Sequence, residues 1–398
     1  MAKAFEAVKV SERVYWVGAI DWTIRNFHGY LTDRGTTYNA YLIKGENTNI
    51  LVDTVKRSFV GEMLERVSSV VDIGSVDTII SHHSELDHSG SLPMAVGAMS
   101  PKRVLTSKAG IDVLGRHFSL GVPVEAVVTD TPMDIDGVSM TFYDAKMLHW
   151  PESMLSFLGG DGVLFSQDGF GMHLASHERF TDELSEWVVN REASKYFANI
   201  LMPLGGPVAK VLGKLAPLVP EVKVIANDHG PLWRTGIDNI VAKYKCWAER
   251  VPSRKMVVAY ATMWQSTAQM ARAIAEGAAS CGVRVEVMSL ECTHRSDVVA
   301  ELLDAAAFVV GSPALNGQMY PTVADLLTYV KGLKPKGLIG AAFGSYGWSP
   351  SALEQVNGML EEAKVRIVEK PLGLRFVPTD EDLLSCRQFG AALAGHIK

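Results

Sequence analysis

The chain has 398 residues, of which 47% are hydrophobic and 21% are charged, so it can bury substantial cores and is most simply two domains. Its formal net charge of −6 argues against nucleic acid as the main partner, because duplex binding requires a concentrated basic surface. No stretch approaches the roughly 20 apolar residues of a membrane helix, and residues 1–6 lack an apolar signal region, so we expect a cytoplasmic protein without membrane partners.

The first quarter of the chain alternates short β-type runs with turn residues. The runs are residues 14–18, 39–45 and 49–54. Closely spaced strands of this kind are typical of the sheets of an αβ/βα sandwich. After them, residues 59–71 carry apolar side chains at helical spacing, with Met63 and Val67 four apart, which predicts a helix laid over the sheet.

The apolar run 76–80 is followed at once by a cluster of side chains that can bind metal. The cluster consists of His82, His83, Glu85, Asp87 and His88. The run indicates a buried strand, and the loop at its end is held by a rigid scaffold while substrate can reach it. Imidazole and carboxylate together suit zinc or iron, although surface loops also carry these residues for solubility.

Three single residues of the same chemical kind lie further along, in contexts that also resemble strand ends. They are His149, Asp168 and His229. Three more ligands at strand ends would complete a site for two metal ions. His173 and His177 follow Asp168 too closely to be independent ligands, so we expect them beside the ligands or on the surface, and His117 to be structural.

Helices dominate the chain between the last two candidate ligands and again after them. Residues 182–218 form a helical stretch, and residues 237–248 indicate one further helix after His229. Residues 249–254 are polar and contain a helix-breaking proline. We therefore predict a first domain over residues 1–250 and a second over residues 255–398.

The second domain begins with the sequence strand, hydroxyl-rich turn, helix. Residues 256–260 are apolar, residues 261–267 contain three Ser or Thr side chains, and residues 268–277 have helical spacing. Hydroxyl groups and the free N–H groups of a helix start can bind a phosphate, and the helix dipole favours its charge. Taken alone this indication is weak, because Ser and Thr are also ordinary residues at helix starts.

The remainder of the domain repeats this alternation of strand and helix. Further strands are expected at residues 283–287, 306–313 and 337–344, each preceded by a helix. That pattern predicts a doubly wound parallel sheet, which binds ligands at the C-terminal ends of its strands. The loops at those ends are residues 261–267, 313–317 and 345–349.

The pattern H-x-E-x-D-H, followed by a lone His, a lone Asp and a His before Gly, resembles the metallo-β-lactamase superfamily. Its zinc hydrolases carry His where this chain has Glu85. A carboxylate there is the mark of the flavodiiron proteins, to which residues 148–151 (Leu-His-Trp-Pro) and 35–41 (Gly-Thr-Thr-Tyr-Asn-Ala-Tyr) are also similar. The resemblance extends over essentially the whole chain and indicates the two-domain A-type of that family.

The resemblance implies a metallo-β-lactamase-like diiron domain with no catalytic residues beyond the ligands. One iron would be held by His83, Glu85 and His149, the other by Asp87, His88 and His229, with Asp168 between them. His88 is the ligand that a water can replace in the family. The four cysteines have no close C-x-x-C spacing, which excludes a fused rubredoxin-type iron site and predicts free, mostly buried thiols.

For the second domain the resemblance is to flavodoxin, which implies bound FMN with its phosphate in the first loop and its ring between the other two. Trp348 would stack on the isoalloxazine. Gln265, Ala314 and Gly317 depart from the residues more usual at these places in flavodoxins or flavodiiron proteins. The expected FMN-binding residues are Thr262, Met263, Trp264, Gln265, Ser266, Thr267, Pro313, Ala314, Leu315, Asn316, Gly317, Ser345, Tyr346, Gly347 and Trp348.

A flavodiiron protein would reduce O₂ to water, NO to N₂O, or both, with electrons passed through FMN. Rubredoxin is the preferred external donor and a reduced deazaflavin the second, and the family implies a head-to-tail homodimer or a dimer of dimers. Two other classes compete with this hypothesis. One is a zinc hydrolase with an appended flavodoxin domain, and the other is a flavodoxin-type carrier whose first domain has lost its metal. Glu85 argues against the former and seven intact ligand positions against the latter.

Overall fold

The computed structural model describes residues 3–398, which divide into two compact units. The second unit comprises Cys246–Lys398 together with two short segments from earlier in the chain, His28–Leu31 and Phe197–Gly205. The first unit holds the rest. The domain boundary expected at residues 250–255 stays a prediction, because helix α7, Ile237–Glu249, continues through the point at which the units divide.

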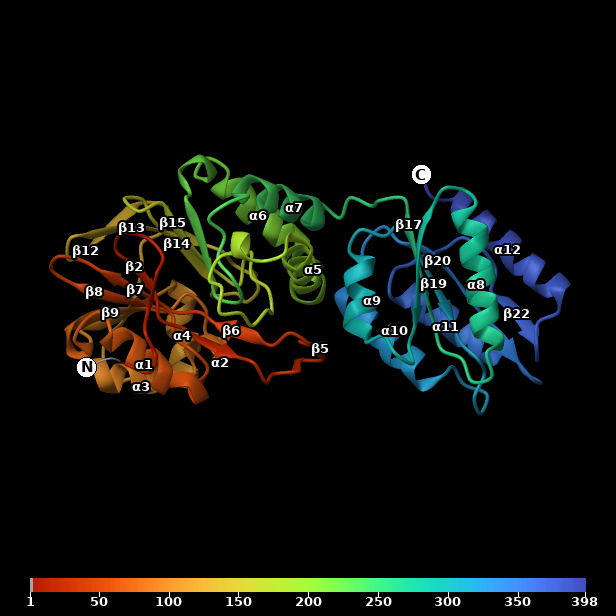
Figure 1. Ribbon diagram of the computed structural model, residues 1–398, viewed down its shortest axis with the longest axis horizontal. Helices are drawn as coiled ribbons and strands as arrows, with labels where there is room; N and C mark the ends of the chain where they lie inside the picture. Colours follow the sequence, from red (N-terminus) through yellow and green to blue (C-terminus); the bar gives the residue numbers. More distant parts are fainter. Residues whose placement is uncertain (1–2) are drawn as a thin grey trace. The chain divides into compact units, whose positions relative to one another are not determined.

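Two mixed sheets form the frame of the first unit (Figure 1). The larger has the strand order β1 (Val8–Lys9), β2 (Val14–Trp16), β7 (Tyr41–Lys44), β8 (Asn49–Val52), β9 (Val76–Ile80), β10 (Arg103–Thr106) and β11 (Val124–Ala126). The smaller has the order β12 (Pro132–Ile135), β13 (Val138–Asp144), β14 (Met154–Leu158), β15 (Val163–Gln167) and β16 (Val224–Asn227). A short ladder, β3 (Ala19–Asp21) with β6 (Thr36–Tyr38), lies outside both.

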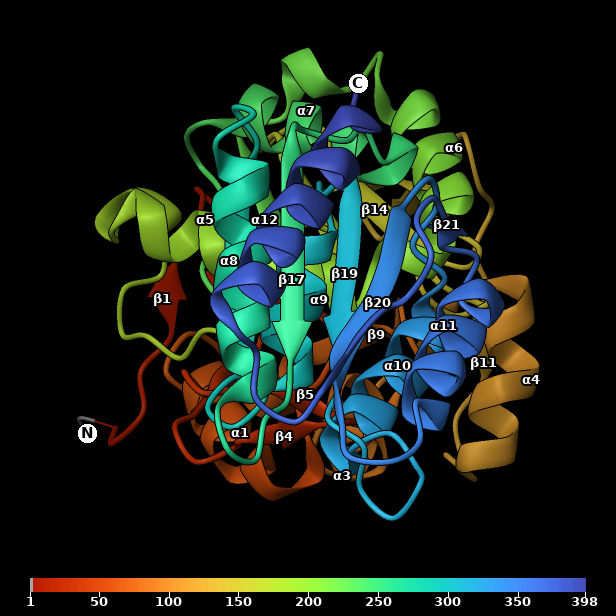
Figure 2. The ribbon, with the colours of Figure 1, turned by 90° about the vertical axis from the view of Figure 1, so that its right-hand side faces the viewer.

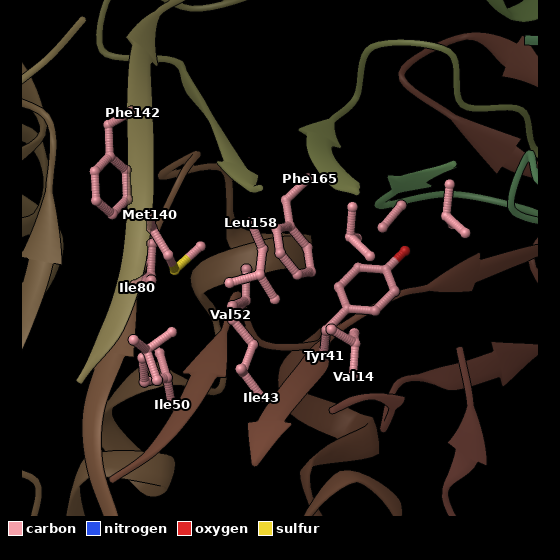
Figure 3. Packing of buried hydrophobic residues seen from close by; sticks show 14 of the residues in the cluster. Val14, Tyr41, Ile43, Ile50, Val52, Ile80, Met140, Phe142, Leu158 and Phe165 are labelled. Atoms are coloured by element: carbon pink, nitrogen blue, oxygen red, sulfur yellow. The ribbon is translucent and has the colours of Figure 1, made fainter. Parts of the chain in front are cut away.

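The core of this unit lies between the two sheets. Figure 3 shows Tyr41, Val52 and Ile80 from the larger sheet meeting Phe142 and Phe165 from the smaller one. All five are buried. Since successive side chains of a strand point to opposite faces, the other face of each sheet needs its own cover. Helices provide it, so the predicted αβ/βα sandwich is confirmed.

Helices are present within the predicted ranges 59–71 and 182–218 and at the predicted range 237–248, together with others. They are α1 (Val60–Ser68), α2 (Leu86–Ser89), α3 (Leu92–Met99), α4 (Lys108–His117), α5 (Glu186–Tyr196), α6 (Gly205–Leu215) and α7. In α1, the side chains of Met63 and Val67 are buried, and Ser107 caps α4 by accepting from the backbone N–H of Gly110. The stretch 182–218 is not one helix, since a π-helical turn, Phe197–Leu201, and Pro203 interrupt it.

A parallel sheet forms the centre of the second unit. Its order is β18 (Arg284–Ser289), β17 (Lys255–Tyr260), β19 (Ala307–Gly311), β20 (Ile339–Tyr346) and β21 (Arg366–Ile367), and β22 (Leu372–Arg375) also pairs with β20. The second strand of this unit, β18, thus lies outside the first, β17, as in flavodoxin-like doubly wound sheets. The predicted fold of this unit is confirmed.

Five helices cover this sheet: α8 (Ser266–Ala279), α9 (Arg295–Leu302), α10 (Pro321–Leu333), α11 (Ser351–Glu362) and α12 (Asp380–Gly395). Two of them, α8 and α12, approach each other very closely. In Figure 2, α8 and α12 lie side by side over β17. A Cβ at Gly390 would lie 1.9 Å from the carbonyl oxygen of Ile274, so only glycine allows this contact.

All four cysteines are free, but the prediction that they are mostly buried is wrong. Only Cys386, on the sheet-facing side of α12, is buried. Cys246 lies on the outer side of α7, while Cys281 and Cys292 lie in turns at the ends of α8 and β18, where solvent reaches them. Among residues 3–398, no helix has the length and apolar character to cross a membrane.

Candidate functional site

The seven predicted ligands converge in the first unit because each lies at or near the end of a strand. His83, Glu85, Asp87 and His88 follow β9, His149 lies between β13 and β14, Asp168 follows β15, and His229 follows β16. Strand ends of the two sheets therefore bring together residues that are far apart in the sequence. Two groups result, each with all its ligand atoms within 4.8 Å of one another.

The first group joins two histidines and two carboxylates. The Nε2 atom of His149 lies 3.1 Å from Oε2 of Glu85 and 3.2 Å from Oδ2 of Asp168. The Nε2 atom of His83 lies 3.3 Å and 3.4 Å from the same two oxygens. Two nitrogens and two oxygens thus surround one point, which is a donor set that iron or zinc accepts.

The second group joins Asp87, His88 and His229, and it also faces Asp168. Nε2 of His229 lies 3.2 Å from Oδ2 of Asp87 and 3.4 Å from Oδ1 of Asp168. Nε2 of His88 lies 3.3 Å from that same Oδ1 atom. Asp168 therefore presents one carboxylate oxygen to each group, which is the arrangement of a bridging ligand.

Residues around the two groups fix the orientation of the ligands. The Nδ1 atom of His83 lies 3.0 Å from Oε1 of Glu152, and that of His229 lies 2.7 Å from the carbonyl oxygen of Thr37. A hydrogen bond on Nδ1 leaves Nε2 of each ring to face the metal position. The Tyr196 hydroxyl donates to Oδ1 of Asp168 at 2.9 Å, which holds the shared carboxylate in place.

The electrostatics of the cluster keep its carboxylates ionised. Burial raises the pKa of Asp168, but His88 and His149 outweigh it and hold that pKa well below its ordinary value. Burial likewise raises the pKa of Glu85, which hydrogen bonds from His149 and His83 bring below its usual range. Burial lowers the pKa of His149, and the two carboxylates raise it to about 10. A metal cation and protons therefore compete for these histidines.

Two of the histidines that we did not expect to be ligands, His173 and His177, lie where the sequence suggested. His173 is buried against the ring of His229, with ring centroids 4.8 Å apart, and its Nδ1 atom lies 2.8 Å from the hydroxyl of Thr36. His177 is exposed, and it contacts Trp22 at the surface. His117 ends α4 and belongs to neither ligand group.

A second candidate site lies in the other unit, in a cavity of about 490 Å³ at the C-terminal ends of β17, β19 and β20. All three predicted loops contribute to its lining, including Thr262, Ser266, Asn316 and Trp348. Helix α8 begins at its edge, so free N–H groups of the first turn lie there. Two predicted residues, Gln265 and Thr267, are not part of the lining: the backbone of Gln265 is left-handed (φ 68°), and the Thr267 hydroxyl lies 3.3 Å from that of Ser345.

Comparison with known proteins shows one family for the whole chain. A family model described as ODP family beta lactamase matches residues 36–230, and one described as Flavodoxin matches residues 258–390. The chain is 38% identical over 98% of its length to a nitric oxide reductase of Moorella thermoacetica, covering 99% of that protein. Among solved structures, rubredoxin oxygen:oxidoreductase of Desulfovibrio gigas has a TM-score of 0.93 at 37% identity, with 98% of each chain covered. The flavodiiron protein of Giardia intestinalis has a TM-score of 0.95 at 29% identity, with 99% of this chain and 97% of that chain covered.

The chain belongs to the flavodiiron protein family. It is therefore an oxidoreductase whose cofactors are FMN and a pair of irons, and the alternative of a zinc hydrolase is not favoured.

The residues of the first site fit a pair of irons in this flavodiiron protein. Both carboxylate oxygens of Asp87, Nε2 of His88 and Oδ2 of Asp168 are buried without a hydrogen bond among residues 3–398, while Nδ1 of His88 lies 3.3 Å from Oδ2 of Asp228. Buried polar groups normally have partners, so such atoms in both ligand groups indicate bound cations. The mixture of imidazole and carboxylate suits iron.

The residues of the second site fit FMN. The volume of the cavity is within the usual range for pockets that bind molecules of this size. Trp348 is 86% exposed beside it and Trp264 is 89% exposed, so both indoles are available for stacking on a flat ring system. Hydroxyl groups at the start of α8 can bind a phosphate.

Sequence reasoning missed the side chains that support these sites. Glu152 lies in the same loop as His149 and could have been found as a carboxylate three positions after a ligand. Tyr196 gave no signal, because it lies 28 residues from Asp168, its partner. Phe376 and Val377 also line the flavin cavity, since β22 pairs with the end of β20 and brings them there.

Proposed function

We propose that this flavodiiron protein reduces O₂ to water or NO to N₂O at a diiron centre, with electrons passed through FMN from an external donor. The observation that carries the proposal is the pair of ligand groups that share Asp168, with Glu85 as a carboxylate in the first group. Glu85 separates this site from zinc hydrolases, whose corresponding residue is His.

The residues proposed as iron ligands form two sets. His83, Glu85 and His149 would hold one iron, Asp87, His88 and His229 the other, and Asp168 would bridge them. FMN would lie in the cavity formed by the three loops of the second unit. We assign the diiron centre to a domain of residues 1–250 and FMN binding to a domain of residues 255–398.

Two ferrous irons and one fully reduced FMN together hold four electrons, which is the number that reduction of O₂ to two waters consumes. Residues next to the proposed iron ligands hold those ligands in place. Glu152 and the carbonyl of Thr37 fix the rings of His83 and His229. The hydroxyl of Tyr196 donates to Asp168, so this carboxylate keeps both oxygens directed at the two ligand groups. Five of the seven ligands are buried and Glu85 and His149 are only partly exposed, which limits the access of bulk water.

We propose rubredoxin as the electron donor, in line with the name of the Desulfovibrio gigas relative. A reduced deazaflavin is the second candidate, because other relatives are named coenzyme F420H(2) oxidases. Transfer between flavin and irons would use a head-to-tail homodimer, in which the FMN of one chain faces the irons of the other, alone or as a dimer of dimers. The cytoplasmic location expected from the sequence remains part of this proposal.

The test is metal and flavin analysis of the purified protein, followed by anaerobic reduction and parallel O₂ and NO consumption with rubredoxin as donor. We expect about two irons and one FMN per chain, with turnover of at least one gas, and the ratio of the two rates identifies the preferred substrate. Bound zinc with no consumption of either gas would contradict the proposal and favour a hydrolase. Reduced F420 in place of rubredoxin distinguishes the two donors.

A further inference from the structure

One histidine of the metal-binding cluster in the sequence is not among the ligands. His82 directly precedes His83, but it belongs to neither ligand group. Its side chain is fully buried, and its ring stacks on Phe165 in the core between the two sheets, with ring centroids 6.4 Å apart. A buried imidazole in an apolar core needs hydrogen-bond partners, so the contacts of its two nitrogens indicate what this residue does.

Asp53 holds both the backbone and the ring of His82. Its Oδ1 atom accepts from the backbone N–H of His82 at 2.7 Å, and its Oδ2 atom lies 2.5 Å from Nδ1 of the ring. Because a carboxylate accepts, Nδ1 is the ring nitrogen that carries a hydrogen. Asp53 directly follows β8, and its own N–H donates to the carbonyl oxygen of Ile80 on β9. These contacts therefore join the ends of two neighbouring strands.

The other ring nitrogen of His82 reaches the smaller sheet. Nε2 lies 2.8 Å from the hydroxyl oxygen of Ser156, in the middle of β14. With the hydrogen on Nδ1, Nε2 of the neutral ring accepts and the hydroxyl donates. The carbonyl oxygen of His82 accepts from the backbone N–H of Met154 on the same strand at 3.2 Å. All four polar groups of His82 thus have partners, two on Asp53 and two on β14.

The loop before β14 holds the neighbouring ligand as well. Oε1 of Glu152 lies 3.0 Å from Nδ1 of His83 and accepts from the backbone N–H of Ser84 at 3.0 Å. The same loop carries His149, the other histidine of the first ligand group. Residues 149–156 therefore supply one ligand of this group and hold the chain on both sides of another. We call the point that this group surrounds the first metal position.

Asp53, His82 and Ser156 also have the order of contacts found in the catalytic triads of serine hydrolases. In those enzymes the serine oxygen attacks a substrate, which must reach it. Here the three side chains are 1%, 0% and 0% exposed, respectively. No substrate therefore reaches Ser156, and the contacts act on the protein itself.

We propose that His82 is a positioning residue for the first metal position: held by Asp53 and Ser156, it fixes the backbone from which His83 approaches His149. Ligands need to be held within about 0.5 Å of their productive geometry, and a ring bound at both nitrogens leaves the adjoining peptide little freedom. Because the contacts act on one ligand of one group, they matter for one metal ion of the pair. That this ion is iron rests on the proposed function; that the first position depends on His82 does not.

The test measures how tightly each position holds its metal. The iron- and FMN-loaded protein is incubated anaerobically with increasing chelator, and anomalous diffraction of its crystals at the iron edge gives the occupancy of each position. Ser156→Ala removes the hydroxyl and leaves the contact of His82 with Asp53 in place. In this variant the first position should lose its iron at a roughly tenfold lower chelator concentration than in the parent protein, the low end of the range for loss of a supporting partner. The second position should be unchanged.

His82→Leu removes both ring contacts and should give the larger effect, roughly 10- to 100-fold at the first position alone. If it does not fold, because Asp53 loses its ring partner, Ser156→Ala still decides the question. Thr78→Val is the matched control. It removes a buried hydroxyl of β9 that has no hydrogen-bond partner within residues 3–398, so both positions should hold iron as in the parent protein. The thermal midpoint of each variant is measured in parallel.

Two results would overturn the positioning role. One is unchanged chelator resistance of the first position in Ser156→Ala. The other is an equal loss at both positions with a lower thermal midpoint, which would show that His82 only stabilises the fold. If the parent protein holds zinc in place of iron, the proposed function fails instead, and the same competition at the zinc edge still decides the role of His82. The two failures are therefore distinguishable.

Discussion

The metal loops of the first unit and the flavin loops of the second both lie at strand ends, yet their side chains meet solvent very differently. Most of the ligands around Asp168 are buried, with Glu85 and His149 only partly exposed, and His83 and His229 are each tied to a further residue through Nδ1. Beside the flavin cavity, Trp264 and Trp348 are 89% and 86% exposed. A site that gathers buried charge needs its partners fixed, whereas a site that binds by stacking can leave its rings in solvent.

The strongest test of this comparison removes the carboxylate that distinguishes the first site. Glu85→Ala deletes the oxygen that lies 3.3 Å from His83 and 3.1 Å from His149, so two histidines lose their shared partner. We expect gas consumption to be abolished and the iron content to fall while FMN stays bound. Full retained activity would contradict the diiron assignment. Glu186→Ala, at an exposed position of α5, is the control.

Glu152→Gln tests whether the residues around the ligands matter as much as the comparison implies. The variant keeps the shape of the side chain but weakens the contact with Nδ1 of His83, 3.0 Å away. Loss of such a partner typically lowers metal affinity or activity by about 10- to 100-fold. Iron affinity, measured by competition with a chelator, should fall in this range with no change in FMN affinity. An unaltered iron affinity would mean that packing alone orients His83.

Glu192 tests whether buried charge is tolerated in the first unit away from the ligands. Burial raises its pKa to about 6, and Lys195 only partly offsets this. Between the ordinary pKa of a glutamate and pH 6, Glu192 is ionised in the unfolded chain but still protonated in the folded one. The free energy of unfolding therefore falls as the pH rises through this range. Above pH 6 the ionised, buried carboxylate of Glu192 lowers the free energy of unfolding by its full amount, about 2 kcal/mol.

Glu192→Gln removes this cost. The variant should therefore have a higher thermal midpoint than the parent protein at pH 7, and the difference should disappear at about pH 4, where both states of the parent hold a proton. Equal midpoints at pH 7 would show that the ion pair with Arg34, 3.2 Å away, compensates for the burial.

Trp348→Ala gives the smallest expected effect and tests the second site. Loss of one stacked ring costs about 0.5–1.5 kcal/mol, which corresponds to a roughly 2- to 13-fold weaker FMN affinity. The iron content should not change. Trp187→Ala is the matched control, since this tryptophan is also exposed but lies on α5 of the first unit. FMN affinity equal to that of the parent protein would identify Trp348 as a packing residue.

The sequence predicted both folds and the convergence of the seven ligand residues, because strand periodicity and local spacing determine where strand ends lie. Asp168 could be found because it directly follows a strand, β15, and Glu85 because it lies in the loop after another, β9. The supporting contacts could not be found in this way. Tyr196 reaches Asp168 only through the course of α5 over the sheet, which no local pattern records.

The flavin cavity shows the same limit. Its three loops follow from the alternation of strands and helices, but Phe376 joins them through the pairing of Tyr346 with Arg375, a register that periodicity does not determine. The exposure of three cysteines was also missed, because a thiol is as compatible with a helix end as with a core.

The pairing of β22 with β20 also has a consequence for protein synthesis. All seven proposed iron ligands have been translated by residue 229, whereas the flavin cavity lacks a wall until Phe376 has been added. At about 5–20 residues per second, the ribosome needs on the order of ten seconds to make the chain between these points. The first unit can therefore begin to fold and acquire metal on the nascent chain, while a complete flavin pocket forms only once nearly the whole chain has been made.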